Sequence, residues 1–133
     1  MHARDMISAH PDVKGSVSEP LIGCIEACFD CAQTCISCAD ACTAEARVTE
    51  LRQCIRLDMD CADVCAMTGA LASRRSGENV GVLRSAIELC ALACRLCAEE
   101  CDKHAQHHQH CRICAEECRR CQQACVSALR TLH

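Results

Sequence analysis

The spacing of the cysteines constrains this chain more than any other feature, because 18 of its 133 residues are cysteine. Within each group, successive cysteines are 3, 4 or 7 residues apart, which is the spacing along one face of an α-helix. Polar residues recur at the same period on the opposite faces, so each helix is predicted to be amphipathic with thiols in place of leucines. The groups are Cys24, Cys28, Cys31, Cys35, Cys38 and Cys42; Cys54, Cys61 and Cys65; Cys90, Cys94, Cys97 and Cys101; and Cys111, Cys114, Cys118, Cys121 and Cys125.

The breaks between these groups predict four helices. The first opens at Ser18-Glu19-Pro20, where proline in the first helical turn costs no hydrogen bond. The other breaks are expected at residues 46–49, at Ser76-Gly77 before a capping Asn79, and within residues 104–110. Connections this short make neighbouring helices antiparallel.

The predicted fold is therefore all-α: an antiparallel up-down-up-down four-helix bundle with a cysteine-lined core. Residues 18–133 are expected to form the bundle and to bind metal, and residues 1–17 to form an N-terminal arm. The two ends of the bundle differ in chemistry. One end receives a turn that is rich in histidine, and the other receives aliphatic residues such as Leu21, Ile25 and Leu83.

Three explanations compete for the thiol stripe. Cysteine as simple core packing is disfavoured, because so many small side chains would leave costly voids. Disulfides within one helix are disfavoured, because residues 3 or 4 apart have Cβ atoms about 5–6 Å apart whereas a disulfide needs about 3.5–4.5 Å; disulfides between helices stay possible on oxidation. Metal binding uses the spacing well, because two thiolates on one helical face can hold one ion, and eight such CxxxC pairs occur.

Soft thiolates select Cu(I), Zn(II) or iron–sulfur clusters. Structural zinc needs four ligands in a tetrahedron, and iron–sulfur clusters need cysteine sets in loops, so a continuous helical stripe fits neither well. Cu(I) accepts two or three thiolates, and sharing each thiolate between two ions gives about one ion per cysteine. The single charges of Cu(I) and thiolate then cancel in an interior where net charge is costly.

Composition excludes several other classes of protein. The net charge of −4 argues against a nucleic-acid partner. No secretory signal and no run of about 18 apolar residues is recognised, so we expect a cytoplasmic protein with no membrane partner. No paired acid and base, activated nucleophile or phosphate loop is present, so we expect no enzyme activity.

The repeated CxxxC stripes, above all Cys24 to Cys42 and Cys90 to Cys125, resemble those of the bacterial copper storage proteins over residues 20–130. The absence of a signal resembles the cytosolic branch of that family. The resemblance implies storage of many Cu(I) ions in a pre-folded bundle and assembly as a homotetramer. The second helix departs from the pattern because it has only three cysteines, so its copper lining should be thinner.

Three histidines continue the thiol stripes and are candidate ligands where copper would enter: His104, His108 and His110. Asp58, four residues after Cys54, is either a ligand near that end or a residue at a helix seam. Met59 lies off the stripe and is interpreted as a packing residue rather than a ligand.

Other functions stay open at this point. A zinc or cadmium buffer would use the same thiolates, and a thiol redox protein would need an exposed, low-pKa cysteine at a helix N-terminus, where only Cys111 lies. A structural bundle with incidental thiols is the third alternative. If the cargo is copper, its donor is expected to be a copper chaperone or a low-molecular-weight thiol.

Overall fold

The computed structural model describes residues 1–132, and these form helices joined by loops, with no strand among them. This confirms the predicted all-α class. A short 3-10 helix, η1, leads directly into α3. The elements are α1 (Ala3–Ser8), α2 (Glu19–Thr43), η1 (Val48–Leu51), α3 (Arg52–Ser73), α4 (Val80–Asp102) and α5 (Gln109–Leu129).

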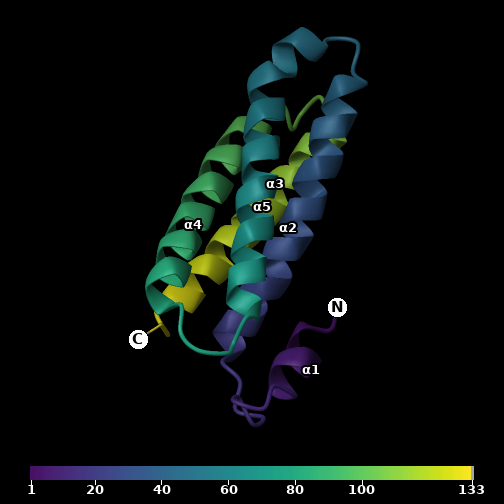
Figure 1. The fold of residues 1–133 in the computed structure, drawn as a ribbon. Coiled ribbons are helices and arrows are strands. Elements are labelled where there is room, and N and C mark those ends of the chain that lie inside the picture. The colour runs from purple at the N-terminus through teal and green to yellow at the C-terminus, as the bar shows by residue number, and fades with distance from the viewer. Residues whose placement is uncertain (133) are drawn as a thin grey trace.

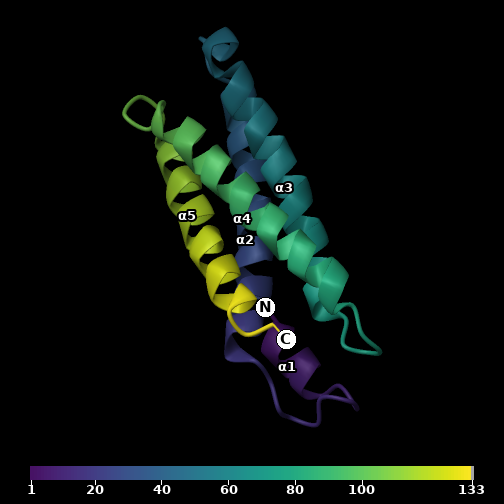
Figure 2. The ribbon, with the colours of Figure 1, turned by 90° about the vertical axis from the view of Figure 1, so that its left-hand side faces the viewer.

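The four long helices run antiparallel to their neighbours around one axis, as Figures 1 and 2 show. Helix α2 packs against α3 and α5, and α4 packs against the same two helices from the other side. The α2–α3 and α4–α5 connections lie together at one end, which we call the mouth. The α3–α4 connection and both chain termini lie at the other, closed end (Figure 1). The up-down-up-down bundle is thus confirmed.

Helix boundaries follow local chemistry, with two corrections to the sequence prediction. The Ser18 hydroxyl accepts a hydrogen bond from the Leu21 amide at 3.4 Å, with Pro20 in the first turn as predicted. The predicted break at residues 46–49 was wrong in part, because Val48–Leu51 forms η1 and the non-helical link is residues 44–47.

The second correction concerns Asn79, which the sequence predicts to cap the third long helix. It precedes α4, but its side chain makes no capping hydrogen bond to that helix. Its backbone dihedrals (φ −139°, ψ 26°) are not the extended ones of a capping residue. The side-chain amide instead donates to the Leu71 carbonyl at 3.0 Å, and so ties the end of α3 to the start of α4. Gly77, at φ +65°, makes the sharp turn between them.

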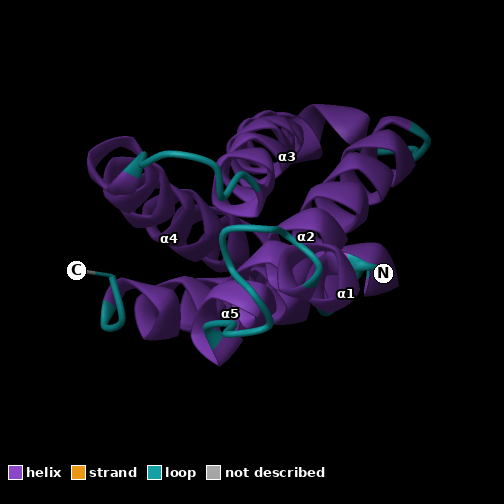
Figure 3. Cartoon of the chain, turned by 60° about the horizontal axis from the view of Figure 1, so that its bottom comes forward, coloured by secondary structure: helices purple, strands orange, loops and turns teal. Residues whose placement is uncertain are grey.

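The core consists of sulfur along most of its length and of aliphatic side chains at the closed end. Ile22, Ile25, Leu83 and Ile87 are almost completely buried there, in agreement with the predicted aliphatic end. The arm covers this end from outside: Ile7 of α1 is buried and Arg4 pairs with Glu19. Figure 3 shows α1 lying beside α2, outside the ring of long helices.

From the sequence, no apolar run long enough to span a membrane is expected, but helix α2 contains one by length and hydropathy. Its length and composition alone would allow it to cross a membrane, with a mean hydropathy of 1.3 over 18 residues. Its six cysteines raise that hydropathy, and all six point into the bundle and are buried. Core helices of bundles can have the same length and hydropathy, and α2 packs as a core helix against α3 and α5.

A pair of glycine variants tests the close approach of α2 and α3. A Cβ added at Gly69 would lie 2.9 Å from the Phe29 ring, whereas one added at Gly23 would meet nothing within 4 Å. We expect Gly69→Ala to lower the free energy of unfolding by about 1–2 kcal/mol, because the ring must shift. Gly23→Ala should raise it by about 0.5–1 kcal/mol, because alanine favours the helix. Urea unfolding of the reduced variants measures both, and equal effects would contradict the packing described.

Candidate metal centre

The sulfur atoms of all 18 cysteines lie in the core, where every thiol is free and buried. Neighbouring Sγ atoms are 3.6–4.0 Å apart, both along one helix and between helices. For example, Cys65 of α3 is 3.6 Å from Cys90 of α4, and Cys35 of α2 is 3.7 Å from Cys118 of α5. The four stripes therefore meet on the bundle axis.

The thiols gather into sets of four whose sulfur atoms all lie within 4.8 Å of one another. Four of the five sets named below share cysteines with one another, so they join into one column instead of standing as separate sites. The fifth set, at the mouth, adjoins them through Cys54, whose Sγ is 3.6 Å from that of Cys101, which is in turn 4.0 Å from that of Cys97. The sets include Cys28, Cys90, Cys121 and Cys125; Cys31, Cys65, Cys94 and Cys121; Cys31, Cys35, Cys61 and Cys118; Cys35, Cys97, Cys114 and Cys118; and Cys38, Cys42, Cys54 and Cys111.

Such a column suits soft cations that share ligands. In a tetrahedral zinc site with bonds of about 2.3 Å, the sulfurs are about 3.8 Å apart, so distance alone fits zinc as well as copper. Sharing of sulfurs between sets distinguishes copper from isolated zinc sites, because each isolated tetrahedral site needs four sulfurs of its own. The cysteines that belong to two sets are Cys31, Cys35, Cys118 and Cys121. The column has the form expected for bridging thiolates.

Burial favours the neutral form of a thiol over the thiolate until a metal replaces the proton. At the mouth, desolvation raises the pKa of the Cys42 thiol to about 12, and the charges of Cys54 and Asp58 add to this effect. A bound cation reverses the preference, since a coordinating thiol loses its proton outright. Metal uptake by this core is therefore coupled to proton release.

Asp58 projects into the thiol column from α3, one helical turn after Cys54. Its side chain is fully buried, and its Oδ1 accepts hydrogen bonds from Cys97 at 3.1 Å and Cys114 at 3.3 Å. Desolvation, with the charges of Cys114 and Cys54, raises its pKa to about 8. Of the two sequence interpretations, the structure favours the core position over a seam, because the carboxyl lies among the sulfurs.

His110 is the predicted histidine that reaches the thiols. Its Nδ1 lies 3.5 Å from the Sγ of Cys38, 3.6 Å from that of Cys111 and 4.0 Å from that of Cys42. It therefore joins the set of four sulfurs at the mouth as a fifth donor. His108 stacks on His110 with ring centroids 5.5 Å apart.

Two glutamates at the mouth were missed by the sequence reasoning. Glu45, in the α2–α3 connection, contacts His110 Nε2 at 2.8 Å and His108 Nδ1 at 2.9 Å, and the hydrogen bond with His110 lowers its pKa. Glu100 accepts from His104 Nε2 at 2.9 Å. A signal existed for both, since each lies three residues after a cysteine and so continues a stripe.

Of the other candidates, His104 is half-buried and bonded to Glu100, while His107, a further histidine of the same connection, is exposed. Met59 is 56% exposed and lines a surface groove between α2 and α3. The structure thus brings together the 18 cysteines, Asp58 and His110, with His108 and His104 around them.

A bundle that holds a buried column of thiols with histidines at one end defines a class of metal-storing protein. Residues 17–130 match the model of the family described as "Copper storage protein". The chain belongs to this family, which confirms the resemblance seen in the sequence.

Solved structures agree with this assignment. The copper storage protein Ccsp from Streptomyces lividans, loaded with 10 copper equivalents, is 47% identical with a TM-score of 0.93, and the match covers 98% of this chain and 99% of that one. The Cu(I)-bound copper storage protein BsCsp3 is 39% identical with a TM-score of 0.68 over 78% of this chain and 92% of that one. An uncharacterized cysteine-rich protein, YhjQ, of Bacillus subtilis is 40% identical over 64% of this chain and 75% of its own length.

The raised pKa of Asp58 predicts how the stability of the metal-free, reduced protein depends on pH. The neutral carboxyl is favoured in the fold, so its stabilising contribution is complete below the unfolded pKa of 3.8 and is lost as pH rises through about 8. Ionisation of this carboxyl can lower the free energy of unfolding by at most about 1.4 kcal/mol per pH unit. Asp58→Asn, which stays uncharged, should remove this part of the slope between pH 4 and 8 in urea unfolding. Parallel slopes for the two proteins would contradict it.

Proposed function

We propose that this protein stores Cu(I), held by the 18 core cysteines together with His104, His108 and His110. One observation carries the proposal: the buried sulfurs form a continuous column in which four-membered sets share members. Shared thiolates allow about one ion per cysteine, whereas separate sites would hold about four ions. The proposal assigns this binding to residues 18–133 and none to the arm of residues 1–17.

Charge supports Cu(I) over zinc or cadmium as the stored ion. Thiolates and monovalent ions in equal number leave the core neutral, while divalent ions at the same loading would leave a large positive charge in a low-dielectric interior. The similarity to the copper-loaded Ccsp and the Cu(I)-bound BsCsp3 points the same way. Asp58 provides one oxygen ligand among the sulfurs, a harder donor that breaks the uniform thiolate lining.

Copper enters at the mouth in this proposal. The three histidines there are half-buried, while the closed end is filled by aliphatic side chains and covered by the arm. A copper chaperone or a low-molecular-weight thiol in the cytoplasm delivers the ion, which then exchanges from thiolate to thiolate along the column. The similarity to a cytosolic copper storage protein from Streptomyces lividans supports that compartment.

The other functions receive less support. A thiol redox protein needs an accessible reactive cysteine, but Cys111 at the start of α5 has no exposed surface. At the mouth, borderline imidazole donors lie around a thiol set and are themselves bonded to carboxylates, which is an arrangement for binding and handing on an ion. Storage without catalysis is therefore the function proposed.

Anaerobic titration of Cu(I) into reduced protein, against a competing chromogenic chelator, tests the stored ion and its number. We expect tight uptake to about one ion per cysteine, followed in the ultraviolet because the chain has no Trp and no Tyr. Helical circular dichroism should change little, since the bundle forms before loading. The variant Cys94→Ser/Cys97→Ser, which keeps the core size, should lose about two ions.

Saturation at about four ions, or displacement of Cu(I) by Zn(II) in the same sample, would contradict the proposal and favour the zinc buffer.

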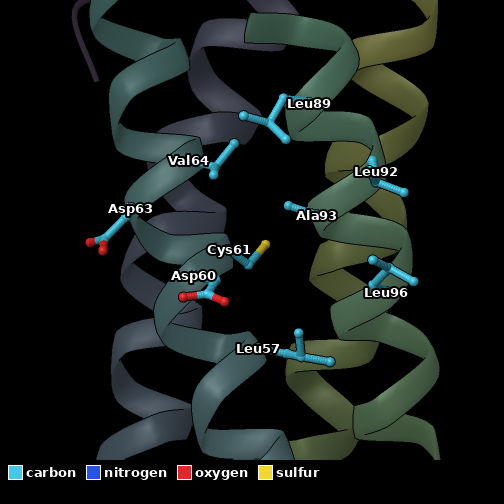
Figure 4. A pocket seen from close by; sticks show the side chains of 9 residues that line it. All are labelled: Leu57, Asp60, Cys61, Asp63, Val64, Leu89, Leu92, Ala93 and Leu96. Carbon is cyan, nitrogen blue, oxygen red and sulfur yellow. The ribbon is translucent and has the colours of Figure 1, made fainter.

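We also propose that copies of the chain assemble, as the homotetramer that the family resemblance implies. A groove of about 360 Å³ between α3 and α4 supports contact with a second copy. Figure 4 shows Val64 of α3 facing Leu89 of α4 at one end of it, and Leu57 of α3 pointing towards α4 at the other end. Leu89, Leu92 and Leu96 are 46%, 43% and 37% exposed, a row of apolar side chains that a second copy would cover.

Replacing one leucine of this row tests the interface. Leu92→Glu should shift the molar mass measured by light scattering from a multiple of 14.5 kDa towards the monomer, because a charge would be buried between copies. Val82→Glu is the control, since Val82 is exposed on the same helix but does not line the groove. A wild-type protein that is monomeric at every concentration would contradict the assembly.

A further inference from the structure

Glu45 joins the two connections that form the mouth. It follows the end of α2, where its amide donates to the Cys42 carbonyl at 3.2 Å. Its Oε2 lies 2.8 Å from His110 Nε2 and 2.9 Å from His108 Nδ1, both at the start of α5. One carboxylate oxygen therefore holds two imidazoles that lie more than sixty positions away along the chain.

The chemistry of these contacts fixes which nitrogen of each ring carries the proton. An ionised carboxylate only accepts hydrogen bonds, so His110 must donate through Nε2–H and His108 through Nδ1–H. In the neutral ring, the opposite nitrogen then keeps its lone pair. For His110 that nitrogen is Nδ1, which is the atom that faces Cys38, Cys42 and Cys111.

The distances from this nitrogen suit a shared ion. With metal–nitrogen and metal–sulfur bonds of about 2.0 and 2.3 Å, as at zinc, bound nitrogen and sulfur lie about 3.5 Å apart in a tetrahedron and about 4.3 Å apart in a line. The separations of 3.5, 3.6 and 4.0 Å from His110 Nδ1 to the three sulfurs fall in this range. In the other tautomer, Nδ1–H would donate to a sulfur and could not bind the ion.

We propose that Glu45 is the positioning residue of the mouth: it holds His110 with Nδ1 free towards Cys38, Cys42 and Cys111, and His108 with Nε2 free. This role rests on the proposed storage of Cu(I), because it concerns how the ion is first accepted. The two stacked rings then offer a soft ion two nitrogens in succession, His108 Nε2 and then His110 Nδ1. Glu45 itself does not bind copper.

The first test reads the tautomer directly, without copper. In reduced wild-type protein with ¹⁵N-labelled histidine, at a pH where imidazole is neutral, His110 should show protonated Nε2 and unprotonated Nδ1. Its signals are assigned by comparison with His110→Ala. Glu45→Ala should give a mixture of tautomers, and Glu50→Ala, an exposed neighbour paired only with Arg47, should leave the spectrum unchanged. A single unchanged tautomer in Glu45→Ala would overturn the proposal.

The second test measures Cu(I) transfer from a chelator by stopped flow. Glu45→Ala should slow the initial uptake about tenfold while total capacity stays the same, as for other residues that orient a metal ligand. Glu45→Gln keeps an oxygen that can accept hydrogen bonds but loses the negative charge that strengthens them, so its uptake rate should lie between those of wild type and Glu45→Ala. In a His108→Ala/His110→Ala background, Glu45→Ala should have no further effect, because Glu45 acts through those rings.

The outcomes separate the two proposals. If wild type and Glu50→Ala take up no Cu(I), storage itself is refuted. If both load normally and Glu45→Ala loads at the same rate, or slows uptake equally with and without the histidines, the positioning role is refuted while storage stands.

Discussion

Four helices must approach closely enough for their cysteine sulfurs to meet on one axis, and the rest of the structure depends on this. Because the cysteine side chain is small, sulfurs from different helices can meet only if the helices pack closely. A thiol core therefore needs helices whose facing surfaces are narrow and whose connections are short. Separations of 3.6–4.0 Å between sulfurs of different helices show that this approach is achieved. The Phe29 ring against Gly69, where α2 meets α3, shows how little space is left between neighbouring backbones.

The two ends divide the tasks of holding the fold together and admitting the ion. At the closed end, Ile25, Leu83 and Ile87 supply the apolar burial that thiols alone provide poorly, and the arm covers them. At the mouth, ionisable groups replace aliphatic ones, and carboxylates hold the histidines in place. In the proposed route of entry, access is confined to the mouth, and an ion bound at the closed end has passed along the full length of the column.

Much of this could be predicted from the sequence because it is local. The thiol stripes, the helical class and the antiparallel order follow from spacings of 3 and 4 residues and from short connections. What could not be predicted depends on contacts between distant segments. Glu45 and His110 are 65 positions apart, and Asn79 bonds to the carbonyl of Leu71 rather than to its own helix. The direction in which Asp58 points was likewise ambiguous, since its position borders both the stripe and a seam.

Storage of about one ion per cysteine requires a continuous thiol column, which can be tested by diffraction from crystals of the fully loaded protein on either side of the copper absorption edge. The predicted result is an unbroken line of anomalous peaks along the bundle axis, from Cys24 and Cys125 at the closed end to His110 at the mouth, with single thiolates shared by adjacent ions. Peaks confined to a few separated four-cysteine sites, or lying outside the core, would contradict it.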